Sequence, residues 1–415
     1  MPRSHRLLAA LACLPAALAA QTSFALHNGD TVVFYGDSIT DQRLYTSFTE
    51  TYVVTRFPSL RVRFVHSGWG GDRVTGGGGG PVDLRLHRDV FPFKPTVVTI
   101  MLGMNDGHYR SYDQSIFDVY ANGYRHIVDS IETALPGVRI TAIEPSPYDD
   151  ITRPPTFEGG YNAVLKRYSQ FVRELAASDH LTDADFNTPV DTMLENAKAK
   201  DPTLAQKILP DRVHPSPGGH LIMAEALLES WHAPSLVART VIDAQSASVT
   251  ECDNCSVSNL AHNGALTWTE TDKSLPMPIN WKDPVVALAV NSSGFVSALD
   301  EETLRVTGLA SGRYALKIDG TDVATFTSGQ LASGVNLAEY DTPMSRQAAD
   351  VHALTVKHNN IHFARWRMVQ VPLDGDGFDD APAQTALDQL EDQVILAQHL
   401  AAQPQPHSFA LAAAQ

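Results

Sequence analysis

The sequence predicts an α/β domain, with a parallel sheet covered by helices on both faces, followed by a smaller β-rich domain and a helical C-terminal region. Three observations predict this fold. The chain has 415 residues, which is too long for one ordinary domain. From Thr31 to about Trp231, short apolar runs alternate with longer amphipathic stretches, as strands and helices do in a parallel sheet. After about Pro234 the chain becomes rich in Thr, Val, Ser and Gly, which favours β-structure.

Four short apolar runs are expected to form the parallel strands. They are rich in β-branched and aromatic residues and cover residues 31–35, 61–65, 96–102 and 138–143. The longer amphipathic stretches predict helices over residues 44–57, 112–135 and 161–177. Ligands of such sheets bind beyond the carboxyl ends of the strands. The residues that directly follow each apolar run are therefore the candidates for a functional site.

The second half of the chain divides into two regions. Residues 304–309 and 313–320 alternate apolar and polar side chains, as half-buried strands do, so a small β-sandwich is expected. Helical spacing returns over residues 345–369 and 385–402. The expected organisation is a leader at 1–20, the α/β domain at 27–235, the β-rich domain at 240–345 and a helical region at 346–415.

The first 20 residues have the pattern of a secretory signal peptide. Arg3 and Arg6 precede the apolar run Leu7–Leu18, and Ala17-Leu18-Ala19 is a small-x-small cleavage site. The alternative is a buried first helix. After this segment no apolar run approaches the roughly 20 residues of a membrane-spanning helix. We therefore expect an exported protein, periplasmic or secreted.

The charge balance limits the class of partner. The net charge is −16, and removal of Arg3 and Arg6 with the leader makes it −18. A non-specific nucleic-acid binder needs a basic footprint, so this class is not expected. A neutral substrate is compatible with the charge. The composition does not indicate an oligomeric state.

After the leader, two cysteines remain, in Cys252-Asp-Asn-Cys255. In an oxidising compartment such a pair can close a small disulfide ring. A redox role is an alternative, but no strand–CxxC–helix context surrounds the pair. A zinc site would need two more ligands, and only His262 is near in the sequence. A structural disulfide is the favoured interpretation.

The first segment with a chemical signature is Phe34-Tyr-Gly-Asp-Ser-Ile-Thr-Asp41. An expected strand ends here, Gly36 allows a tight turn, and Ser38 stands where a helix begins. Backbone N–H groups are free at a helix N-terminus, so a serine there can attack a carbonyl while its own N–H holds the oxyanion. The alternative is that Asp37 or Ser38 only caps the helix.

Two further segments supply possible hydrogen-bond donors. Glycines in His66-Ser-Gly-Trp-Gly-Gly-Asp72 let a backbone N–H approach a ligand closely, although ordinary turns use glycine too. Gly103-Met-Asn-Asp-Gly107 directly follows the third expected strand. Asn105 in it can present its side-chain amide to a developing oxyanion. An Asx turn is the alternative for Asn105.

The fourth segment is Asp211-Arg-Val-His-Pro-Ser-Pro-Gly-Gly-His220. Asp211 and His214 lie three residues apart on an expected loop. This spacing lets the carboxylate bind one imidazole nitrogen and fix the tautomer, which leaves the other nitrogen to take a serine proton. His220 has no carboxylate three residues before it and is not expected to act in this way.

Together and in this order, the four segments resemble the sequence blocks of the SGNH (GDSL-type) hydrolases, over about residues 30–235. The resemblance implies a flavodoxin-like α/β/α sandwich and esterase, lipase or carbohydrate deacetylase activity. It also implies that Ser38 is the nucleophile, with Asp211 and His214 as its partners. The oxyanion donors would be Ser38, Gly71 and Asn105, with Gly70 as the alternative to Gly71. This mechanism needs neither a metal nor a cofactor.

Aromatic side chains just beyond the expected strand ends are candidates for the substrate pocket. They are Trp69, His108, Tyr109 and Tyr148. Aromatic rings stack on sugars, but the same residues are also compatible with core or rim packing. The sequence shows no long apolar lid segment, which favours short acyl esters, such as acetylated sugars, over long-chain lipids. A lipase or phospholipid acylhydrolase of the same mechanism is the alternative.

A second hypothesis places the main function in the β-rich domain, as a glycan-binding module. Trp268, Trp281 and Tyr314 would then form a platform for sugar rings, although core packing is the more usual role of such residues.

Overall fold

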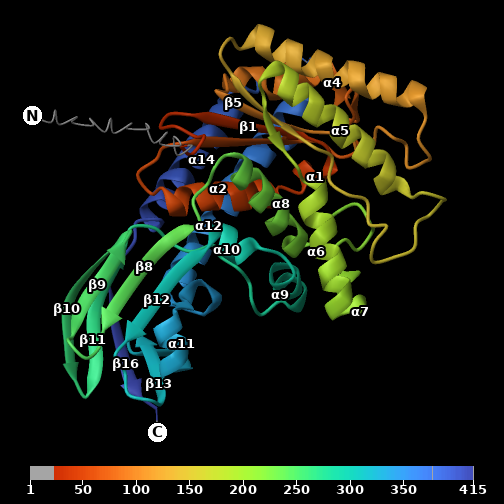
Figure 1. The fold of residues 1–415 in the computed structure, drawn as a ribbon. Helices are drawn as coiled ribbons and strands as arrows, with labels where there is room; N and C mark the ends of the chain where they lie inside the picture. The colour runs from red at the N-terminus through yellow and green to blue at the C-terminus, as the bar shows by residue number, and fades with distance from the viewer. Residues whose placement is uncertain (1–22, 376, 415) are drawn as a thin grey trace, which may run out of the picture.

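The computed structural model describes residues 23–375 and 377–414. The expected leader therefore lies outside the described residues. A five-stranded parallel sheet in the order β2-β1-β5-β6-β7 forms the centre of the first domain (Figure 1). Its strands are Thr31–Gly36 (β1), Arg63–Gly68 (β2), Val97–Met101 (β5), Arg139–Ile143 (β6) and Thr182–Ala184 (β7). This topology confirms the predicted three-layer α/β fold.

Helices cover both faces of this sheet. Figure 1 shows α4 and α5 on one face and α2 and α8 on the other. The helices of this domain are Ser38–Asp41 (α1), Leu44–Arg56 (α2), Val82–Asp89 (α3), Gln114–Ala134 (α4), Tyr161–Asp179 (α5), Asn187–Lys200 (α6), Pro202–Ala205 (α7) and Pro217–Ser230 (α8). The described helices are all too short or too polar to cross a bilayer.

The second strand runs further than the apolar pattern indicated. It was expected to end at Val65, but β2 continues to Gly68. The two polar residues that extend it are buried and satisfied: His66 Nδ1 pairs with the Thr46 hydroxyl at 2.7 Å, and the Ser67 hydroxyl donates to the Asp89 carbonyl at 2.7 Å. Strand β7 and helix α6 were not predicted at all.

Two sheets form the β-rich domain (Figure 1). One has the order β10-β11-β16-β13-β14 and the other β15-β12-β8-β9. Their side chains share one core, and every described strand pair in them is antiparallel except β8–β12. The strands are Leu236–Asp243 (β8), Ser248–Asp253 (β9), Cys255–Asn263 (β10), Ala265–Asp272 (β11), Glu301–Thr307 (β12), Arg313–Ile318 (β13), Thr321–Thr327 (β14), Val335–Asn336 (β15) and His407–Ala413 (β16).

The expected boundaries at 240–345 and 346–415 do not coincide with this packing. Strand β16, in the region expected to be helical, lies between β11 and β13 in the middle of a sheet. Helices α9 (Pro284–Asn291) and α10 (Phe295–Leu299) lie in the β-rich stretch, yet their apolar side chains join the core of the first domain. Segment composition does not reveal these long-range contacts.

Helix α12 (Pro343–Phe363) connects both domains. Met344, Ala348 and Val351 on its first half join the core of the β-rich domain. Its second half packs on α2 beside α14 (Ala381–Ala401), where Glu50 of α2 accepts from His358 Nε2 at 2.5 Å and from Gln398 Nε2 at 2.9 Å. A buried polar network thus fixes the C-terminal helices on the first domain.

Candidate active site

Three loops meet at the carboxyl edge of the parallel sheet. Helix α1 begins at Ser38, two residues after β1 ends. The loop after β2 packs directly on α1, and a Cβ atom on Gly68 would lie 2.2 Å from the Asp41 backbone nitrogen. Glycine is therefore required at position 68. The loop after β5 carries Asn105, which is 9% exposed.

Ser38, His214 and Asp211 form a continuous chain of hydrogen bonds. His214 Nε2 lies 2.7 Å from Ser38 Oγ, and His214 Nδ1 lies 2.6 Å from Asp211 Oδ2. The three residues come from the start of α1 and from the loop before α8. The predicted spacing of Asp211 and His214 places both on one turn, as a backbone hydrogen bond from His214 N–H to Asp211 Oδ1 at 2.7 Å shows.

The environment of Asp211 favours its charged form. Partial burial alone would raise its pKa, but hydrogen bonds from the backbone and side chain of His214 and from Val213 N–H hold the pKa of Asp211 below its ordinary value. A charged carboxylate keeps the proton on Nδ1 of His214. Nε2 is then free to accept the hydroxyl proton of Ser38.

The Asn105 side chain is oriented by hydrogen bonds at both ends. Its Nδ2 donates to the Asp72 carbonyl at 3.0 Å, and its Oδ1 accepts from the Tyr109 hydroxyl at 2.8 Å. The amide nitrogen carries two hydrogens, so one remains for a ligand. For the backbone N–H groups of Ser38 and Gly71, no acceptor is found among the described residues.

The two glycines that the sequence left open as donors differ in the structure. Gly70 N–H donates to Asp41 Oδ2 at 3.2 Å and is therefore engaged. Gly71 has φ +78°, a conformation that glycine adopts without strain, and its α-carbon faces open space. These observations favour Gly71 over Gly70 as the donor.

In the first segment, Asp37 and Ser38 have different contacts. Asp37 caps α1 by accepting from Ile39 N–H at 3.0 Å, while Ser38 faces His214. Burial raises the pKa of Asp37 to about 8. His220 is buried, with its imidazole between Gln42 and the backbone of Tyr45, and burial lowers its pKa to about 3. It therefore belongs to the packing of α8.

The predicted aromatic residues lie in different surroundings. Tyr109 is 43% exposed, and its ring lies 6.1 Å from Tyr148 and 5.0 Å from Tyr161. Tyr109 therefore lies beside both Tyr148 and Asn105, to which its hydroxyl donates. His108 is exposed and has a left-handed backbone. Trp69 is half-buried on the loop after β2, where the ring packs against Trp366.

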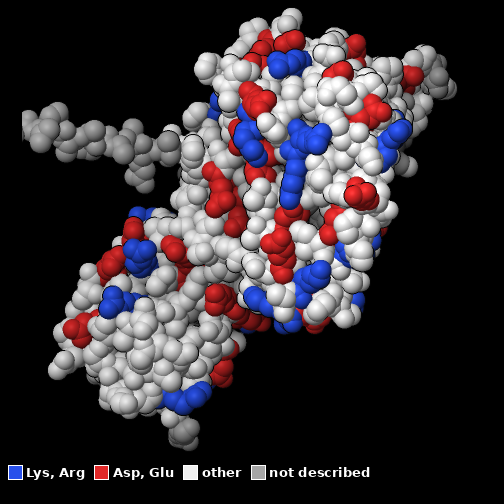
Figure 2. All heavy atoms as spheres, turned by 45° about the vertical axis from the view of Figure 1, so that its right-hand side comes forward, with Lys and Arg blue, Asp and Glu red and all other residues white. Residues whose placement is uncertain are grey.

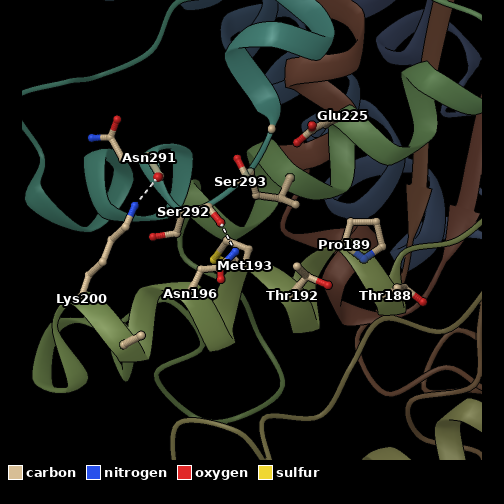
Figure 3. A pocket seen from close by; sticks show the side chains of 13 residues that line it. Thr188, Pro189, Thr192, Met193, Asn196, Lys200, Glu225, Asn291, Ser292 and Ser293 are labelled. Carbon is tan, nitrogen blue, oxygen red and sulfur yellow. Dashed lines mark hydrogen bonds between the residues drawn. The ribbon is translucent and has the colours of Figure 1, made fainter.

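A cavity of about 550 Å³ lies elsewhere, between α6, α8 and the turn that joins α9 to α10 (Figure 3). Its walls include Met193, Ile222 and Glu225 but none of the Ser38–His214–Asp211 group. Asn196 and Lys200 of α6 donate to backbone carbonyls of the α9–α10 turn. The cavity is therefore a junction between the first domain and the α9–α10 segment, apart from the candidate site.

The other sequence motifs are resolved outside this site. Cys252 and Cys255 are joined by a disulfide between β9 and β10. Trp268, expected as part of a sugar platform, is 2% exposed and stacks on Phe409 in the core of the β-rich domain. The platform of Trp268, Trp281 and Tyr314 therefore does not form. In the described chain, no group of three or more His, Cys, Asp or Glu side chains is arranged to hold a metal ion.

The fold and this site define a carboxylic ester hydrolase. Residues 34–222, which carry the whole candidate site, match the sequence model of the GDSL-like lipase/acylhydrolase family. An acetylxylan esterase of Geobacillus stearothermophilus is 28% identical over 226 residues, which are 48% of this chain and 93% of that protein. A solved gut microbial diltiazem-metabolizing enzyme is 25% identical, with a TM-score of 0.80, and the match covers 95% of this chain and all of that one.

Proposed function

We propose that the chain is an exported serine esterase that hydrolyses short acyl esters, acetyl esters above all, on carbohydrates. The observation that carries this proposal is the hydrogen-bonded chain Ser38–His214–Asp211 beside the free donors of Gly71 and Asn105. The acetylxylan esterase relative supports the acyl group and the substrate class. The basic, apolar pattern of residues 1–20 supports export.

The first half of the reaction acylates Ser38. His214 Nε2 takes the hydroxyl proton as Oγ attacks the ester carbonyl, and the carbonyl π electrons move to the oxygen. The N–H groups of Ser38 and Gly71 and the amide of Asn105 stabilise this oxyanion. The oxyanion then collapses, the bond to the alcohol breaks, and His214 gives its proton to the leaving oxygen.

The second half releases the acid. His214 removes a proton from a water molecule, which attacks the acyl carbonyl on Ser38. The second oxyanion uses the same three donors. When it collapses, the carboxylic acid leaves and Oγ recovers its proton from His214. Asp211 stays ionised throughout and stabilises the imidazolium.

The surface around the site suits a neutral, hydroxyl-rich substrate. Tyr109 offers an aromatic ring next to Asn105, and Tyr148 lies beside Tyr109. Acidic and basic side chains are interspersed on the face shown in Figure 2, without one continuous basic area. The net charge of −16 would also repel an anionic phospholipid surface.

A second candidate is a compact acetylated small molecule. The diltiazem-metabolizing enzyme shares this architecture over 95% of the chain, including the β-rich domain and C-terminal helices. Diltiazem itself is the acetyl ester of a secondary alcohol. The same Ser38 chemistry would remove that group.

The test compares three kinds of ester with one enzyme preparation. Wild type, Ser38→Ala and the control Ser256→Ala, an exposed serine on β10, are assayed on acetylated xylo-oligosaccharides, on diltiazem and on p-nitrophenyl esters from acetyl to palmitoyl. We expect hydrolysis to depend on Ser38, to be highest for acetyl groups and to be unchanged in Ser256→Ala. The change at Ser38 should lower kcat at least about 10³-fold.

Three results would contradict the proposal in different ways. Near-normal turnover by folded Ser38→Ala would remove Ser38 as the nucleophile. Activity that rises steadily toward palmitoyl esters would keep the mechanism but favour a lipase. Full recovery of the protein, leader attached, inside the producing cells would contradict export.

A further inference from the structure

A short π-helical segment near the C-terminus lies against the loop that carries Gly71. Residues Ala364–Gln370 form this segment directly after α12. It is almost 300 residues away in sequence from the loop after β2. The two meet because α12 packs on α2 and β2. Two neighbouring side chains of the segment, Trp366 and Arg367, reach the loop.

Arg367 makes three contacts around the loop after β2: with Asp41 of α1, with Gly68 at the end of β2 and with Trp69 in the loop. Its Nη1 lies 3.5 Å from Asp41 Oδ1 and donates to the Gly68 carbonyl at 3.4 Å. Its guanidinium carbon lies 3.4 Å from the centre of the Trp69 ring. The side chain of Arg367 is 18% exposed, so these contacts form in a largely desolvated position, where charge-assisted contacts are stronger than on an open surface.

Asp41 extends this chain of contacts toward the candidate oxyanion donor. One carboxylate oxygen faces Arg367, and the other accepts the Gly70 N–H at 3.2 Å. Gly70 directly precedes Gly71. Gly70, the residue before Gly71, is therefore held by the Asp41 carboxylate. Arg367 in turn holds this carboxylate.

Trp366 and Arg85 hold the same loop from other sides. The Trp366 indole packs edge-on against Trp69, with ring centres 5.7 Å apart, and donates to Asp89 Oδ1 at 2.6 Å. Arg85, fully buried, donates to Asp72 Oδ2 at 2.8 Å and to the Ser67 carbonyl at 2.7 Å. The loop is thus fixed before and after Gly71, and the C-terminal segment supplies one side of this support.

We propose that Arg367 is a positioning residue that, through Asp41 and Gly70, fixes the Gly71 N–H for the oxyanion. The inference rests on the proposed serine esterase function. An oxyanion donor stabilises the transition state fully only when it is held in place before charge develops on the carbonyl oxygen. If the donor had to reorganise during the reaction, the free-energy cost would offset the contribution of its hydrogen bond. The C-terminal segment is then part of the active site, although it lies outside the matched family region at 34–222.

The test removes the guanidinium group of Arg367 and keeps an unbranched apolar side chain in its place. Arg367→Met removes the charge, Arg367→Lys keeps a charge without the planar fork, and Arg365→Met is the matched control. Arg365 lies on the same segment but pairs with Asp388 at 2.7 Å. We expect Arg367→Met to lower kcat for an acetyl ester about 10- to 100-fold, with KM changed less than about 3-fold. This loss is smaller than the roughly 10²–10³-fold loss expected when an oxyanion donor is removed altogether, because the Gly71 N–H is still present. Arg367→Lys should recover some of this loss, and Arg365→Met should keep wild-type kcat.

Two further measurements separate positioning from simple loss of structure. Thermal unfolding reports the folded state, and inhibition by a boronic acid, which forms a tetrahedral adduct on serine, reports the oxyanion site. We expect boronic acid affinity to fall together with kcat in Arg367→Met. A folded Arg367→Met with wild-type kcat, or an equal loss in Arg365→Met, overturns the inference. If Arg367→Met does not fold, Asp41→Asn replaces it, and unchanged kcat and boronic acid affinity in that variant overturn the inference as well.

Ser38→Ala, assayed in parallel, keeps the two hypotheses apart. If Ser38→Ala retains turnover, the proposed function fails, whatever Arg367 does. If activity requires Ser38 and Arg367→Met equals wild type, only the positioning role of Arg367 fails.

Discussion

The hydrogen bond between Tyr109 and Asn105 gives a sharp test of how the candidate oxyanion site is organised. The Tyr109 hydroxyl donates to Asn105 Oδ1 at 2.8 Å, and Asn105 Nδ2 donates to the Asp72 carbonyl at 3.0 Å. Together these contacts fix which way the amide points. The perturbations are Tyr109→Phe, Asn105→Ala and the double variant, which form a double-mutant cycle.

The magnitudes follow from what each change removes. Asn105→Ala removes a preorganised donor, which is worth about 2.7–4 kcal/mol, or about 10²–10³-fold in kcat. Tyr109→Phe keeps the ring and removes one neutral hydrogen bond, worth about 0.5–1.5 kcal/mol, so kcat should fall about 2- to 10-fold. Because Tyr109 acts through Asn105, its hydroxyl should contribute almost nothing once Asn105 is alanine.

The assay is steady-state hydrolysis of p-nitrophenyl acetate by the four proteins under one set of conditions. The expected result is a coupling energy close to the whole effect of Tyr109→Phe, about 0.5–1.5 kcal/mol. Additive effects would refute the reasoning, because they would mean that the Tyr109 hydroxyl contacts the substrate independently of Asn105. A KM change confined to Tyr109→Phe would lead to the same conclusion.

Two more predictions concern stability. Burial lowers the pKa of His358, but the Glu50 and Glu391 carboxylates outweigh burial and raise this pKa to about 9. The contribution of His358 to stability is therefore complete below the unfolded-state pKa of 6.5 and is lost as pH rises through 9. The difference in melting temperature between wild type and His358→Gln should therefore shrink between pH 6.5 and 9; a constant difference would contradict the assignment. Trp268→Ala should destabilise the β-rich domain by about 3–5 kcal/mol in thermal unfolding, because a buried ring stacked on Phe409 is lost. Unchanged stability with lost polysaccharide binding would instead restore the sugar-platform hypothesis.

Local patterns were sufficient to predict four of the five parallel strands of the first domain and the short segments that lie at their carboxyl ends. Strands β1, β5 and β6 are continuous apolar runs, and Ser38, Asn105 and His214 each stand in a short segment next to a strand or helix end. Such signals lie within a few residues of the feature they describe. The hydrogen bonds Ser38–His214 and His214–Asp211 connect the first and last of these segments as the spacing indicated.

What could not be predicted depends on contacts between distant segments. Arg367 and Trp366 carry no motif, and only the packing of α12 on α2 places them at the loop after β2. His66 and Ser67 are polar, so an apolar pattern ends before them, although tertiary hydrogen bonds allow β2 to continue. Trp268 is buried by β16, which lies about 140 residues later.

The central position of β16 has a consequence for how the chain can fold and be divided. Strands β11 and β13 have no partner for their inner edges until residues 407–413 are present. During synthesis, the β-rich domain must therefore wait for residues 407–413 to leave the ribosome, long after the matched residues 34–222 have been made. A fragment that ends before residue 407 would expose two long strand edges and be prone to aggregate. A truncation that removes residues 407–413 therefore takes away the strand that joins β11 to β13.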